Sequence, residues 1–173
     1  WELYAFWTFV PVMLASYNNV YPHANLPVFR LSFAVIASGF FSCVIGGLLS
    51  QKFGTKKTAA LALSLSLFCC LASPLFLAAS SEEAFVLFLI FWGLVVIADS
   101  PLFSTLVAYH APAESKGSSL TIVNCIGFAI TIASIQFINL LSSSIDHRYV
   151  YMFLAIGPAL GLIAMAGNKK RIS

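Results

Sequence analysis

The chain has 173 residues, of which 60% are hydrophobic and only 9% are charged, and its mean hydropathy is +0.94. A soluble domain carries about 25% charged residues, so this chain has too few charges to cover a surface in water, and its main solvent is lipid. The net charge of +3 is too small, and the basic residues are too dispersed, for nucleic-acid binding, so no nucleic-acid partner is expected.

Long charge-free runs follow one another along the whole chain, and the run from 84 to 113 is interrupted only by Asp99. A helix needs about 20 residues to cross the hydrocarbon core, and the alternation typical of barrel strands is absent. The sequence therefore predicts one all-α, polytopic membrane domain over residues 1–173. We expect six transmembrane helices near residues 1–18, 28–50, 58–79, 84–109, 118–142 and 149–167.

The first predicted helix carries an acidic residue beside aromatic residues. If the helix begins at Trp1, Glu2 is an interfacial charge of no special interest. If other residues precede Trp1, Glu2 is a carboxylate buried in the membrane, and the short length of the apolar run favours this second reading. Trp1, Tyr4 and Trp7 fit an aromatic belt or a ligand-stacking face equally well.

Lys52, Lys56 and Lys57 crowd into residues 51–57, a short loop between two apolar runs, which is typical of a cytoplasmic turn. With this loop inside, seven basic residues are cytoplasmic, and only Arg30 and Arg148 lie outside. The seven are Lys52, Lys56, Lys57, Lys116, Lys169, Lys170 and Arg171. Both ends of the chain are then cytoplasmic if it is complete at Trp1; otherwise Trp1 lies within the membrane.

Asp99 is the acidic residue nearest the middle of a predicted span. A carboxylate at this depth costs at least about 2.5 kcal/mol, so it should face a cavity or a partner, and it is a candidate functional residue. The structural alternative is an interhelical hydrogen bond, for example to Asn124 or Gln136.

The predicted helix at 118–142 carries Thr121, Asn124, Thr131 and Ser134 close to one face. This stripe lines an aqueous path or bonds neighbouring helices. The residues that we expect along a substrate or proton pathway are Glu2, Tyr4, Asp99, Asn124 and Thr131.

The cysteines and the small residues of the apolar runs are interpreted mainly as packing residues. All four cysteines lie inside apolar runs without metal-site spacing, so they are read as packing residues, and no metal or cofactor is expected. Stripes such as Ser38, Ser42 and Gly46 allow close helix packing or a moving interface. The three histidines fall in loops, which disfavours an intramembrane serine protease, and the chain is not expected to be an enzyme.

The loop after the second predicted helix resembles the signature G-x-L-x-D-R-x-G-R-K of the major facilitator superfamily. Gly47, Leu49, Lys52, Gly54 and Lys56 match or nearly match that signature. Gln51 stands in place of its acid, a loss that is usual in the copy found in the second half of these proteins. Residues 1–7 and 98–104 are also similar to segments of the seventh and tenth helices of bacterial members.

The resemblance implies the C-terminal six-helix half of a secondary active transporter in the bacterial cytoplasmic membrane. Its partners would be the bilayer, an N-terminal half missing from this chain, and a small-molecule substrate. Glu2 and Asp99 would then face each other near a pathway that opens alternately to each side, with transport coupled to an ion or a proton. The alternative is a non-transporting membrane subunit or scaffold that assembles through its small-residue faces.

Overall fold

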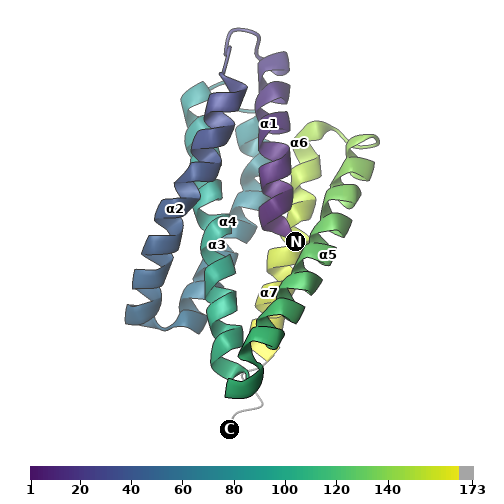
Figure 1. The fold of residues 1–173 in the computed structure, drawn as a ribbon. Coiled ribbons are helices and arrows are strands. Elements are labelled where there is room, and N and C mark those ends of the chain that lie inside the picture. The colour runs from purple at the N-terminus through teal and green to yellow at the C-terminus, as the bar shows by residue number, and fades with distance from the viewer. Residues whose placement is uncertain (168–173) are drawn as a thin grey trace.

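The computed structural model describes residues 1–167, which form a bundle of long helices with no β-strand in that range (Figure 1). Two 3₁₀ segments, Ala113–Ser115 and Tyr151–Ala155, adjoin the last two rods. The predicted all-α architecture with six helical rods is confirmed. The α-helices are α1 (Glu2–Val20), α2 (Val28–Phe53), α3 (Thr55–Leu77), α4 (Glu82–His110), α5 (Lys116–Ser142), α6 (His147–Val150) and α7 (Ile156–Gly167).

Five segments of the described chain are long and apolar enough to cross a membrane. They are Val28–Phe53, Thr55–Leu77, Glu82–His110, Ala113–Ser142 and His147–Gly167. The 19-residue α1 is not among them. The N-terminus lies at mid-height of the bundle (Figure 1), so Glu2, in the first turn of α1, is far from both ends of the bundle.

The loop predicted for residues 51–57 is almost entirely helical, which corrects that prediction. α2 continues to Phe53 and α3 begins at Thr55, so Gly54 alone separates the two helices. Gln and Lys are good helix formers, and the polar residues on both sides of Gly54 therefore extend the helices instead of ending them. Gly54 has φ +88° and ψ 141°, a conformation that glycine adopts without steric cost.

The last rod is not a continuous α-helix. Residues Tyr151–Ala155 form a 3₁₀ turn between α6 and α7. Pro158 follows, and its missing N–H cannot bond the carbonyl of Leu154 one turn earlier. The tighter 3₁₀ turn is the local consequence.

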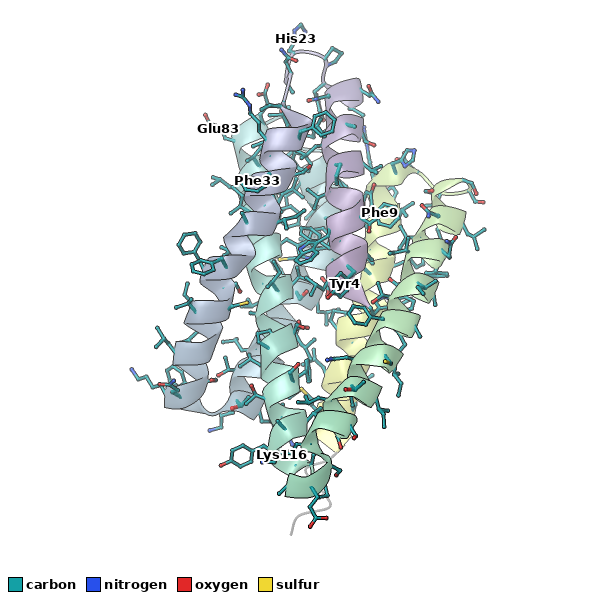
Figure 2. The ribbon with its side chains drawn as sticks, viewed as in Figure 1. Tyr4, Phe9, His23, Phe33, Glu83 and Lys116 are labelled. Atoms are coloured by element: carbon teal, nitrogen blue, oxygen red, sulfur yellow. The ribbon has the colours of Figure 1, made fainter. Side chains whose placement is uncertain are left out.

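The described lysines and Glu83 lie at opposite ends of the bundle. Figure 2 shows Lys116 at one end, and His23 and Glu83 at the other. The corner between α2 and α3, with its three lysines, is at the same end as Lys116 (Figure 1). Three of the predicted cytoplasmic residues, Lys169, Lys170 and Arg171, lie outside the described residues.

The small-residue stripe of α2 packs against α4 inside the bundle. A Cβ added at Gly93 would lie 2.9 Å from the carbonyl oxygen of Val35, and one added at Gly39 would collide with Ile97. The Ser42 hydroxyl donates a hydrogen bond to the carbonyl of Leu94. Close approach of the two helices therefore depends on these small residues, in the manner of membrane helix pairs.

Candidate functional site

Glu2 is 6% exposed and belongs to a buried polar cluster that joins three helices. One carboxylate oxygen, Oε1, accepts hydrogen bonds from Ser66 Oγ at 2.5 Å, Cys70 Sγ at 3.2 Å and Trp92 Nε1 at 2.8 Å. Ser66 and Cys70 are one turn apart on the same face of α3, and Trp92 comes from α4. All three donors are buried.

The second oxygen of Glu2, Oε2, is equally buried but has no hydrogen-bond partner within residues 1–167. Buried polar atoms in folded proteins are nearly always paired, so an unpaired one calls for an explanation in terms of function or a missing ligand. Glu2 also lines a cavity, although protein atoms cover Oε2 itself.

The cavity that Glu2 borders has a volume of about 260 Å³ and lies between the start of α1, the middle of α4 and α5. All five residues predicted for the pathway line it: Glu2, Tyr4, Asp99, Asn124 and Thr131. Ser100 and Ser104 of α4 add two hydroxyl groups. The lining residues include no Lys, Arg or His within the described part of the chain, so the fixed charges of the cavity wall are acidic.

Asp99 is half-buried on α4, about in the middle of a 29-residue helix. No hydrogen bond joins its side chain to Asn124 or Gln136 in the described part of the chain, so the function of Asp99 and its structural alternative both stay predictions. Asp99 instead borders the cavity, to which α4 and α5 contribute separate parts of the wall.

Aromatic rings form part of the cavity wall. The ring of Tyr4 packs against Phe128 of α5 and against Trp7, with centroid distances of 5.4 Å in both pairs. Phe103 of α4 lines the same cavity. Tyr4 is 38% exposed, and the ligand-stacking reading of this aromatic group stays a prediction.

The polar stripe of α5 divides into two parts. Thr121 and Asn124 are exposed, whereas Thr131 and Ser134 are buried. The hydroxyls of Thr121 and Thr131 donate to carbonyls four residues earlier in their own helix. Neither threonine therefore uses its hydroxyl proton to hold another helix, and Thr131 is among the residues that line the cavity.

Comparison with known proteins places the chain in a family. The model of the Major Facilitator Superfamily matches residues 2–135. The chain belongs to the major facilitator superfamily. A search of curated protein sequences gave no match.

A solved structure of a superfamily transporter has a similar fold. It is the partially occluded inward-open conformation of the xylose transporter XylE from E. coli, with a TM-score of 0.71 and 22% sequence identity. The alignment covers 96% of this chain and 45% of the XylE chain. The present superfamily chain thus spans less than half the length of that transporter, and it is a multi-pass membrane protein.

Sequence reasoning does not find the three donors to Glu2 in this superfamily member. Cys70 has the pattern of a packing residue, and Ser66 and Trp92 do not stand out inside apolar runs. A usable signal is present: Ser66 and Cys70 are four residues apart and hence share one helix face. That signal has meaning only once Glu2 is known to lie at mid-height, which the sequence leaves open.

Proposed function

We propose that the chain is the C-terminal six-helix half of a bacterial secondary active transporter, which moves a small solute by alternating access. The observation that carries the proposal is the cavity at mid-height, because residues from α1, α4 and α5 that are far apart in sequence meet there. Transporters bind their substrates near the bilayer midplane, at the interface between structural repeats.

One observation supports the assignment to a half of such a transporter, and a second one favours the C-terminal half. The chain spans 45% of the length of XylE, so a second half of similar size would complete such a protein. Gln51 replaces the acid of the signature, as is usual in the second-half copy. The N-terminal half would belong to the same polypeptide, and the segment from Gly47 to Lys56 would help to hold the two halves together.

The chemistry of the cavity indicates what it would bind. Glu2 and Asp99 supply acidic groups, whereas the described lining offers no fixed positive charge. A proton, or the cationic group of a solute, would compensate these carboxylates, so ion or proton coupling is part of the proposal. Asn124, Thr131 and Tyr4 would orient the solute through hydrogen bonds and ring stacking.

The proposed location is the bacterial cytoplasmic membrane. The end of the bundle that holds Lys52, Lys56, Lys57 and Lys116 would face the cytoplasm, following the positive-inside rule. Trp1, at mid-height, would then lie within the membrane.

Transport by the intact protein tests the proposal. Uptake or efflux of a panel of radiolabelled solutes is measured in proteoliposomes, with and without an imposed proton gradient. We expect Asp99→Asn to abolish gradient-driven accumulation while expression and folding stay normal. Glu83→Gln, which removes an acid at the far end of the bundle (Figure 2), is the matched control and should transport normally.

The opposite outcome is equally clear. If Asp99→Asn and the control accumulate solute alike, Asp99 has no role in coupling. If no solute in the panel moves, and the protein instead co-purifies in a fixed ratio with another membrane protein, the scaffold reading replaces the transporter.

A further inference from the structure

A second cavity lies at the basic end of the bundle, separate from the cavity at mid-height. It has a volume of about 790 Å³ and is bordered by the corner between α2 and α3, the last turns of α4 and the last turns of α7. The two cavities share no lining residue. The proposed solute pathway therefore does not account for this larger space.

The lining of this basal cavity combines positive and apolar groups. Lys56 and Lys57 come from the first turn of α3, whereas Leu106, Leu162 and Met165 come from α4 and α7. No acidic residue occurs among its lining residues in the described part of the chain. The charge suits an anion, and the apolar side suits hydrocarbon.

Aromatic side chains place the basal cavity at the level of the lipid headgroups. Phe53, at the end of α2, is 55% exposed, and Tyr109, near the end of α4, is 85% exposed. Both line the cavity. Tyrosine near the end of a transmembrane helix is typical of the interface between membrane and water, where a ligand can place one part in water and another in lipid.

We propose that the basal cavity binds one anionic phospholipid. The phosphate would lie at Lys56 and Lys57, with a further hydrogen bond available from Thr55, and the first carbons of an acyl chain would lie along Leu162 and Met165. Basic pockets between transmembrane helices are a known form of headgroup site. A water-soluble anion would leave the apolar side of the cavity unused, which is why a lipid fits better.

Native mass spectrometry of the intact protein tests this assignment, with phosphatidylglycerol and phosphatidylcholine as probes. We expect one phosphatidylglycerol to be retained at lipid concentrations where phosphatidylcholine is lost. Removing one surface lysine weakens an anionic headgroup contact about 5-fold, so Lys56→Gln with Lys57→Gln should weaken retention about 30-fold.

Lys116→Gln is the matched control, because it removes the same charge from the same end of the bundle without lining the cavity (Figure 2). It should retain phosphatidylglycerol as the unmodified protein does. Met165→Trp keeps every charge but fills the apolar side, and it should also weaken retention. If the double lysine variant does not fold, Lys56→Gln alone and Met165→Trp provide the same test.

Several results would overturn the proposal. Equal retention of the two lipids would show that the site does not select charge. An effect of Lys116→Gln as large as that of the cavity lysines would show diffuse surface attraction. Displacement of the lipid by equimolar glycerol phosphate would show a site for a soluble anion, and no retained lipid at all would show that other parts of the intact protein cover the cavity.

Discussion

Replacing Glu2 by alanine and by glutamine should have very different effects on stability, because Oε1 and Oε2 have different surroundings. Glutamine keeps a carbonyl oxygen that can accept from Ser66, Cys70 and Trp92 in place of Oε1. Its amide group then takes the position of Oε2, which has no partner within the described residues. Alanine removes the acceptor and leaves all three donors buried.

The cost of Glu2→Ala is dominated by one donor. The hydroxyl of Ser66 can turn to a carbonyl of its own helix, as Ser64 does with Ala60 at 2.8 Å. The Cys70 thiol is a weak donor in any case. The Trp92 indole, 0% exposed, would lose its hydrogen bond and remain buried, which costs about 1–3 kcal/mol.

Truncating a buried side chain also removes van der Waals packing around it. We therefore expect Glu2→Ala to lower the free energy of unfolding by about 2–4 kcal/mol. Glu2→Gln should change it by less than about 1 kcal/mol, since the hydrogen-bonded shape is kept. Titration of the intact protein with sodium dodecyl sulfate, followed by circular dichroism, measures both changes.

A double-mutant cycle identifies the responsible hydrogen bond. Trp92→Phe removes the indole donor, so combining it with Glu2→Ala removes the donor that alanine leaves unpaired. We expect a coupling energy of about 1–3 kcal/mol between the two changes. Strictly additive effects, or equal losses for alanine and glutamine, would refute the reasoning that Oε1 is the structural acceptor.

Four further substitutions, one of them a control, test local features of the fold. Gly93→Ala should destabilise the protein by about 1–3 kcal/mol in the same titration, because its Cβ would press on the backbone of Val35. Gly47→Ala is the control and should be neutral or slightly stabilising, since the space around the new methyl group is open. Equal effects of the two substitutions would contradict the packing argument. Gly54→Ala should cost about 1–3 kcal/mol because of its positive φ, and an unchanged unfolding midpoint would show that the corner can adopt another conformation. Asn18→Leu should release the loop before α2, since the Asn18 side chain accepts a hydrogen bond from the backbone N–H of Leu26 and donates one to the backbone carbonyl of the same residue. Faster proteolysis of this loop is the expected result. An unchanged cleavage rate would count against this anchoring role.

The number of helical rods could be predicted from the sequence because charge is costly in lipid. A single charge within an apolar run, such as Asp99, does not prevent the prediction of a transmembrane helix, since the residues on each side of it remain apolar. The turn at Gly54 is predicted less well, because a cluster of charges marks the membrane boundary but not the end of a helix. Lys52 and Lys56 are compatible with helix, and only the backbone conformation of Gly54 decides where the chain reverses.

The candidate site was predictable in part. Spacing within α5 puts Asn124 and Thr131 near one face, but spacing cannot bring α1 next to α4. That juxtaposition was implied by family resemblance, and the structure has Glu2 and Asp99 on one cavity. The donors around Glu2 are not predictable because serine, cysteine and tryptophan in an apolar run look the same whether they pack or donate a hydrogen bond. Only three-dimensional proximity separates the two cases.

The three hydrogen bonds on Glu2 Oε1 fix the axial register of α1, α3 and α4. A slide of any one of these helices by a single residue, about 1.5 Å along its axis, would stretch at least one of the bonds beyond hydrogen-bond length. The three helices therefore move as one block during any rearrangement that keeps Glu2 bonded. α5 carries no such pin, and just three of its described residues, Thr131, Ser134 and Ile138, are buried. The wall that α5 contributes to the cavity is thus joined to the block by side-chain packing, such as Tyr4 on Phe128, and not by the hydrogen bonds of Glu2.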